Sequence, residues 1–160
     1  MNLKLAVLAD HVNETKEGKL NLLGVFDVLF AKKLPAKHPK LFLVAVFEAS
    51  VSEGSEHKAK VGVYDSDGQE VLPLTPELPL KFQPTGRGKP FQARLVVELE
   101  GLRFPHFGDY EFHLLIDGRI EGQVGLEVRQ IKGGEGSCLG LKSSSPKWFK
   151  ARPEVGVLAK

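Results

Sequence analysis

The sequence feature that most constrains the fold is an alternation of apolar and polar residues with a period of two. It is clearest in residues 91–100, where most apolar side chains are separated by a polar or charged one. Successive side chains of a β-strand point to opposite faces, so this pattern predicts a half-buried strand. No segment sustains the 3.6-residue period of an amphipathic helix. The alternation therefore predicts an all-β protein.

Three other segments refine this prediction. Residues 41–49 are apolar at both even and odd positions, which predicts a central strand covered on both faces. Residues 73–90 carry five of the ten prolines and are expected to form an edge strand with loops, because proline cannot donate to a β-ladder. Residues 20–30 are expected to form one strand with a bend at Gly24. Asp27, within this strand, is expected to face solvent, and His38, after it, is expected to cap a loop.

The last pair of strands, residues 109–117 and 119–129, carries a register signal. A strict two-residue turn at Asp117-Gly118 would place polar and apolar partners on one face of the hairpin, which a buried sheet does not allow. We therefore expect a longer loop or a bulge at Gly122. The expected pairs are Ile116 with Ile120, Phe112 with Val124, and Tyr110 with Leu126.

About eight strands at short spacing, without a crossover helix, predict an antiparallel β-sandwich or a barrel, and we favour the sandwich. Its topology is expected to be an immunoglobulin-like or jelly-roll-like Greek key. The segment Gly108-Asp109-Tyr110 at the start of a strand is similar to the tyrosine corner of immunoglobulin-like sandwiches. We assign residues 1–131 to this domain, a length that buries enough surface to fold without disulfides or metals.

Residues 132–160 form a separate, irregular C-terminal tail. It is rich in Gly and Ser and holds six basic and two acidic residues, whereas residues 1–131 hold 16 and 18. Lys147, Trp148, Phe149 and Lys150 interleave aromatic and basic side chains, as single-strand nucleic-acid binders do. We favour a role as an anchor on the domain or on a neighbouring subunit, and nucleic-acid binding is the lesser alternative. The tail is either docked or mobile.

Composition excludes several classes of protein. Cys138 is the only cysteine, so no intrachain disulfide is possible. No apolar run is long enough for a signal peptide or a membrane span, and the chain is expected to be cytoplasmic, with no membrane partner. The few Asn, Gln, Cys and Met residues suggest a heat-adapted source.

No catalytic or metal-binding constellation stands out. The five histidines lack the spacing of metal ligands, and neither a nucleophile elbow nor a basic partner for Cys138 is present. The glycines of residues 133–143 lack the spacing of a phosphate-binding loop. We expect no catalytic residue, no metal and no cofactor, although a catalytic set assembled by the fold remains open.

One group of motifs resembles an uncharacterised family of small prokaryotic all-β proteins. It consists of Ala9-Asp10, the stretch Gly24-Val25-Phe26-Asp27-Val28-Leu29-Phe30-Ala31, and Pro35 followed by His38-Pro39. The later Asp67-Gly68 turn and the Gly108–Phe112 segment fit as well. The resemblance covers roughly residues 1–130 and implies a single domain, and it brings no assigned activity.

We therefore expect a non-catalytic interaction or assembly module. A homo-oligomer could form through its strand edges or its C-terminal tail. Its candidate binding residues in the tail are Trp148, Phe149, Lys147 and Lys150. The alternative is a small-ligand-binding sandwich with a loop-lined site around Arg87, His106 and Phe107. An enzyme that uses clustered histidines and carboxylates is a third possibility.

Overall fold

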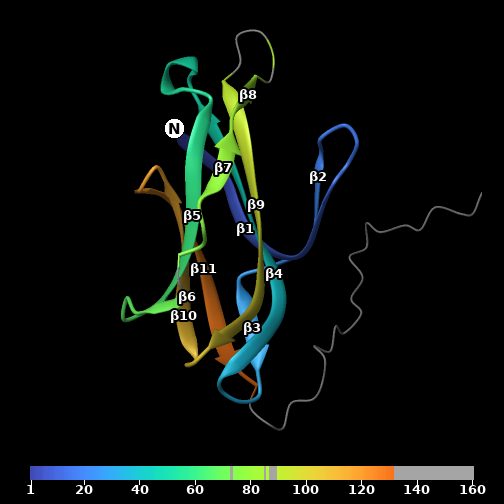
Figure 1. Cartoon of the computed structure of the whole chain (residues 1–160). Coiled ribbons are helices and arrows are strands. Elements are labelled where there is room, and N and C mark those ends of the chain that lie inside the picture. Colours follow the sequence, from blue (N-terminus) through green and yellow to red (C-terminus); the bar gives the residue numbers. More distant parts are fainter. Residues whose placement is uncertain (73, 85, 87–89, 132–160) are drawn as a thin grey trace, which may run out of the picture.

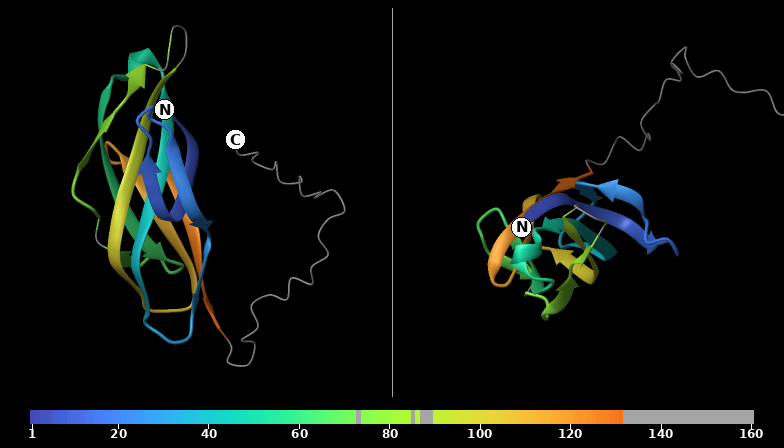
Figure 2. Two further views of the ribbon diagram at one scale, coloured as in Figure 1. Left: turned by 90° about the vertical axis from the view of Figure 1, so that its right-hand side faces the viewer. Right: turned by 90° about the horizontal axis from the view of Figure 1, so that it is seen from above.

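The computed structural model describes residues 1–72, 74–84, 86 and 90–131. These residues form two β-sheets that face each other (Figures 1 and 2). A single 3₁₀ turn, Val51–Glu53, accompanies the strands. The strands are β1 (Asn2–Glu14), β2 (Leu20–Phe26), β3 (Val28–Ala31), β4 (Ala36–Ala49), β5 (Glu56–Asp65), β6 (Glu70–Leu72), β7 (Leu78–Lys81), β8 (Gln83–Pro84), β9 (Phe91–Phe104), β10 (Gly108–Ile116) and β11 (Arg119–Gln130).

The strand order is that of an immunoglobulin-like sandwich. One sheet runs β2-β1-β4-β9-β8 and the other β3-β11-β10-β5-β6, with β7 also paired to β5. Strands β1, β4, β9 and β8 stand where the A, B, E and D strands of that fold do, and β5, β10 and β11 where C, F and G do. The predicted β-sandwich is confirmed. No helix in the described part of the chain is long and apolar enough to cross a membrane.

The core lies between the sheets and is built from the inward-facing residues of the long strands. The central strand β4 is buried on both faces over most of residues 41–49, as its composition predicts. The largest fully buried side chains include Tyr110, Phe47, Phe104 and Phe112. At roughly 25 cal/mol per Å² of apolar surface removed from water, such side chains supply most of the stability.

A tyrosine corner locks the entry into β10. The Tyr110 hydroxyl donates to the His106 carbonyl oxygen at 2.8 Å and accepts from the His106 amide at 3.0 Å. The ring is buried and packs edge-on against Phe104, with centroids 4.9 Å apart. Burial raises the pKa of Tyr110, so the hydroxyl keeps its proton and remains a donor. The Gly-x-Tyr signal in the sequence therefore marks a real structural device.

The β10–β11 hairpin confirms part of the predicted register and corrects the rest. Phe112 pairs with Val124 and Tyr110 with Leu126, and a bulge shifts the register next to Gly122. The pair Ile116–Ile120 was wrong, because Ile116 pairs with Arg119 across a two-residue turn. Positive φ angles at Asp117 and Gly118 suit that tight turn. The bulge alone thus restores the apolar face.

The segment from residue 20 to 31 differs from the prediction. It is not one strand: it leaves the first sheet after β2, passes through Asp27 and joins the second sheet as β3. There β3 pairs with β11 in parallel, so the sandwich is not wholly antiparallel. Asp27 is exposed as expected, and its carbonyl accepts from the Glu127 amide at 2.8 Å. The chain therefore contributes consecutive edge strands to both sheets.

Candidate functional site

The predicted site residues are only partly described by the structure. Arg87 and the tail residues Lys147, Trp148, Phe149 and Lys150 lie outside the described residues. His106 is exposed before β10, beside a shallow hollow of about 240 Å³ that Arg103 and Asp65 also line. Phe107 instead packs against the core. Of the predicted loop-lined site, the described part brings His106 and Phe107 to different surroundings.

The histidines are dispersed. Within the described ranges, no three His, Cys, Asp or Glu side chains gather closely enough to hold a metal ion. Two histidines lie beside an aspartate: His57 with Asp117, and His38 with Asp10. These two pairs are the polar clusters with features of a site, and each lies at a different edge of the sandwich.

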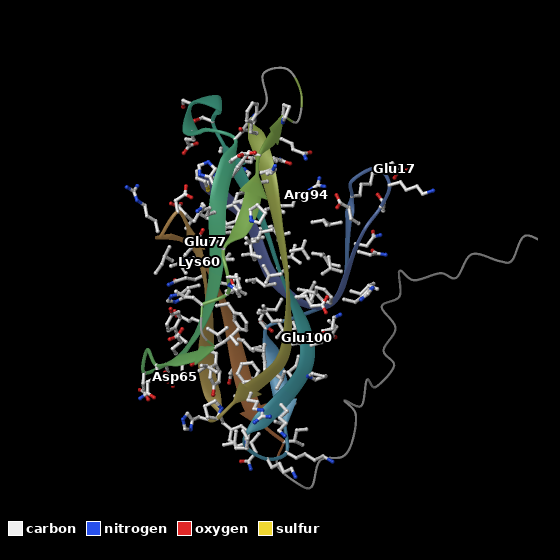
Figure 3. All side chains as sticks on the ribbon, viewed as in Figure 1. Glu17, Lys60, Asp65, Glu77, Arg94 and Glu100 are labelled. Carbon is white, nitrogen blue, oxygen red and sulfur yellow. The ribbon has the colours of Figure 1, made fainter. Side chains whose placement is uncertain are left out.

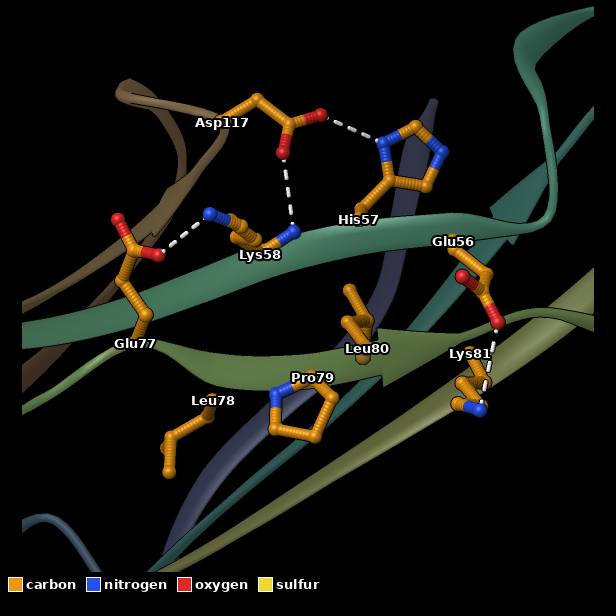
Figure 4. A pocket seen from close by; sticks show the side chains of 9 residues that line it. All are labelled: Glu56, His57, Lys58, Glu77, Leu78, Pro79, Leu80, Lys81 and Asp117. Atoms are coloured by element: carbon orange, nitrogen blue, oxygen red, sulfur yellow. Dashed lines mark hydrogen bonds and ion pairs between the residues drawn. The ribbon is translucent and has the colours of Figure 1, made fainter.

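The first pair ties the β10–β11 turn to β5 (Figure 4). Asp117 Oδ2 lies 2.6 Å from His57 Nδ1, and Asp117 Oδ1 accepts from the Lys58 amide at 2.9 Å. The Asp117 amide donates in turn to the Lys58 carbonyl at 2.9 Å. The His57 side chain and the Lys58 backbone lower the pKa of Asp117 below its ordinary value. Three contacts therefore hold this turn in place.

The same pair is poorly arranged for chemistry on a ligand. His57 Nε2, the nitrogen that would face a substrate, is buried and has no hydrogen-bond partner among the described residues. The ring also packs edge-on against Phe82, with centroids 5.3 Å apart. The neighbouring hollow of about 500 Å³ is lined by His57 and Asp117, by Lys and Glu side chains and by the apolar residues 78–80 (Figure 4). We therefore interpret His57–Asp117 as a structural clamp.

This clamp belongs to an edge that is closed to further strands. We call it the guarded edge: β6, β7 and β8, with Pro76, Pro79 and Pro84. The Glu77 carboxylate forms ion pairs with Lys58 Nζ at 2.7 Å and Lys60 Nζ at 3.4 Å. Figure 3 shows Glu77 and Lys60 close together. Short strands, prolines and charges are the means by which proteins prevent edge-to-edge pairing. The predicted proline-rich edge strand is thus confirmed for the described part of residues 73–90.

The opposite edge has a different surface. We call it the open edge: Leu23 and Val25 of β2, Phe30 of β3, and Leu34 beyond it. Phe30, Leu23 and Val25 are 61%, 59% and 56% exposed. Strands β2 and β3 are the last strands of their sheets, so one side of each is free of any strand within the described chain. Contiguous exposed apolar residues of this kind mark interaction sites.

The open edge surrounds a hollow of about 390 Å³ that holds the second histidine pair. His38 lies within β4 rather than capping a loop, which corrects the sequence expectation. Its Nε2 is 4.0 Å from Asp10 Oδ1, and its ring lies 5.7 Å from that of Phe26. The atom is buried without a hydrogen-bond partner in the described structure.

Gly24 explains how Asp10 reaches this position. Gly24 has a φ of 65°, and a Cβ there would overlap the Asp10 carboxylate. Only glycine tolerates both conditions at little cost. Sequence reasoning did not bring Asp10 and His38 together, because 28 positions separate them and no spacing rule connects them. Their shared place among the motifs of the family resemblance was the available signal.

Comparisons with known proteins agree with the absence of an assigned activity. No curated protein matches the chain. A solved structure of the alkylpurine DNA glycosylase AlkC of Pseudomonas fluorescens, bound to DNA containing an abasic site analog, is similar at 16% identity and a TM-score of 0.39. That match covers 64% of this chain and 27% of the glycosylase chain, and so low a TM-score carries no argument.

The family comparison is more extensive. A family model described as a family of unknown function matches residues 4–129, which span the whole sandwich from β1 to the end of β11. The expected resemblance to an uncharacterised family is confirmed by this match. The chain therefore belongs to the family of unknown function DUF6941.

Proposed function

We propose that this protein is a non-catalytic assembly module whose open edge holds two copies of the chain together. The observation that carries the proposal is the contrast between the edges. Prolines and ion pairs cover the guarded edge, whereas Leu23, Val25 and Phe30 leave the open edge apolar. A protein that only needed to remain monomeric would be expected to protect both edges.

The backbone at this side also favours association. In the described structure β3 pairs with β11 only at residues 127–130, so the earlier residues of β11 have no hydrogen-bonded strand on that side, although β1 packs against them through Leu3 and Gly122. Unpaired strand edges accept an added strand, which supplies main-chain hydrogen bonds while the side chains supply specificity. Two such edges related by a twofold axis are self-complementary, as closed dimers require.

The solution mass of the full chain tests this proposal. Light scattering over a range of concentrations should give a dimer or larger species, and Phe30→Glu should lower the mass, because burying a new carboxylate at the contact is costly. The control is Val96→Glu, which changes an exposed apolar residue on the outer face of β9. A full chain that stays monomeric at every concentration, or equal loss of mass in both variants, would overturn the proposal.

A further inference from the structure

We infer that residues 147–150 of one copy dock in the hollow beneath the open edge of the second copy, with Trp148 as the anchor. This inference rests on the proposed assembly and names what occupies its site. The occupant of the hollow is a segment of this chain that lies outside the described residues. Four features support it: the shape and polarity of the hollow, the chemistry of the segment, and the point where the tail begins.

The hollow suits an aromatic side chain. Val25 and Phe30 form its exposed rim, and Phe26 and Leu29 contribute to its apolar lining. Its volume of about 390 Å³ falls in the range of small-molecule sites, roughly 300–1,000 Å³. Large, rigid aromatic residues in such hollows dominate protein contacts. An inserted indole would cover the apolar surface that the described chain leaves exposed.

The polar side of the hollow holds an acceptor. The Asp10 carboxylate is exposed, and its ion-pair partner His38 lies at the 4.0 Å limit of contact. The indole N–H of a buried tryptophan usually finds an acceptor. Asp10 therefore offers what Trp148 requires at the wall of an apolar hollow.

The charge of the segment matches that of the hollow. Lys147 and Lys150 flank Trp148 and Phe149, and the whole segment 132–160 has four more basic than acidic residues. Asp10 lines the hollow, and exposed Asp27 follows Phe26 between the two edge strands. Lysine ammonium groups at the rim can pair with these carboxylates while the aromatic rings enter the hollow.

The tail begins beside its proposed site. The Ile131 amide donates to the Ala31 carbonyl at 2.9 Å, so the last described residue before the tail lies at the end of β3, beside the residue that follows Phe30. Residues 132–148 number 17. A coil of that length spans roughly 20–25 Å, and an extended chain up to about 60 Å.

Trp148 is the only tryptophan, so its fluorescence reports on its own surroundings in the full chain. Docked tryptophan should emit at shorter wavelength than free indole and resist quenching by acrylamide. Val25→Glu should shift the emission to longer wavelength, restore quenching and raise the dimer dissociation constant by about tenfold or more. Val96→Glu is the matched control and should leave all three unchanged. Trp148→Ala should weaken the dimer in the otherwise unchanged chain, and should weaken it no further in the Val25→Glu variant, in which the hollow no longer accepts the indole.

The outcomes separate this inference from the proposal it rests on. If Phe30→Glu breaks a dimer in which Trp148 is freely quenched, the open edge mediates assembly but the tail does not occupy it, and the inference fails alone. If the chain is a monomer, both fail, whether or not Trp148 is shielded. A dimer whose Trp148 is shielded and then released by Val25→Glu, but not by Val96→Glu, supports both.

Discussion

The two edges of the sandwich are both formed by edge strands, but their side chains have opposite character. At the guarded edge, Pro79 lies within β7, and Glu77 forms ion pairs with Lys58 and Lys60 of β5. At the open edge, β2 and β3 present Val25 and Phe30 to solvent. Both edges have unpaired backbone groups, and only one is protected against pairing. This difference is the observation on which the proposed assembly through the open edge rests.

The edges also differ in how the sheets are joined. On the guarded side, contacts such as the Phe82 amide to the Ser55 carbonyl, at 2.8 Å, and the His57–Asp117 clamp hold the strands. On the open side, β1 and β11 pack directly on each other: Leu3 occupies the space where Gly122 lacks a side chain. The guarded side therefore depends on polar clamps, and the open side on close apolar packing. This contrast predicts different responses to substitution.

The largest expected effect is that of Gly122→Val. A Cβ at Gly122 would lie 2.5 Å from Leu3 Cδ2 and 3.3 Å from Leu114 Cδ1, so the Leu3 side chain must leave its position or β1 and β11 must move apart. Overpacking of this kind typically costs about 1–3 kcal/mol in the free energy of unfolding. Denaturant unfolding measures it. Gly125→Val is the control on the same strand, because nothing lies within 4 Å of a Cβ there. Similar losses in both variants would contradict the close packing of the two sheets.

A smaller effect is expected from Asp117→Asn at the guarded side. Asparagine keeps the turn geometry at φ 49° and the bond from the Lys58 amide, but loses the charge beside His57. The free energy of unfolding at neutral pH should fall by about 0.5–1.5 kcal/mol. The dimer dissociation constant should not change, because the clamp lies away from the open edge.

The pH dependence of this effect follows from the lowered pKa of Asp117, whose ordinary value is 3.8. A carboxyl with a lowered pKa in the folded state contributes stability that is complete above its ordinary pKa and is lost as the pH falls through the lowered one. The gap in unfolding free energy between wild type and Asp117→Asn should therefore shrink below about pH 4. The control is Asp67→Asn, in the exposed Asp67-Gly68 turn, which should leave the unfolding free energy at neutral pH unchanged. A gap that persists undiminished in acid would contradict a charge-based clamp.

How much the sequence predicts depends on whether a feature is local. The alternation in residues 91–100 predicts β9, and the clash of polar and apolar partners predicts the bulge beside Gly122, because both signals lie within one hairpin or strand. The passage of the chain between sheets at Asp27 was missed. Its cause is the parallel pairing of β3 with β11, whose residues lie about a hundred positions away.

The candidate site was predictable to a smaller extent. No sequence signal marks Leu23, Val25 and Phe30 as exposed, because an exposed apolar strand face has the same pattern as a buried one. The proximity of Asp10 to His38 depends on the bend at Gly24, whose φ angle no sequence pattern fixes. An edge protected by prolines is visible in the sequence, whereas an unprotected edge is visible only once the strand order is known.

The smallest effect is expected from Glu77→Gln. This variant tests whether charge or proline protects the guarded edge. Lys58 and then Lys60 lower the pKa of Glu77, yet all three side chains are well exposed, and exposed ion pairs contribute little to stability. We expect a small loss of unfolding free energy, which high salt should reduce further. Measured in the Phe30→Glu background, the solution mass should stay that of a monomer, because Pro79 still cannot donate to an incoming strand. A mass that rises in this variant would show that charge, rather than proline, keeps the guarded edge unpaired.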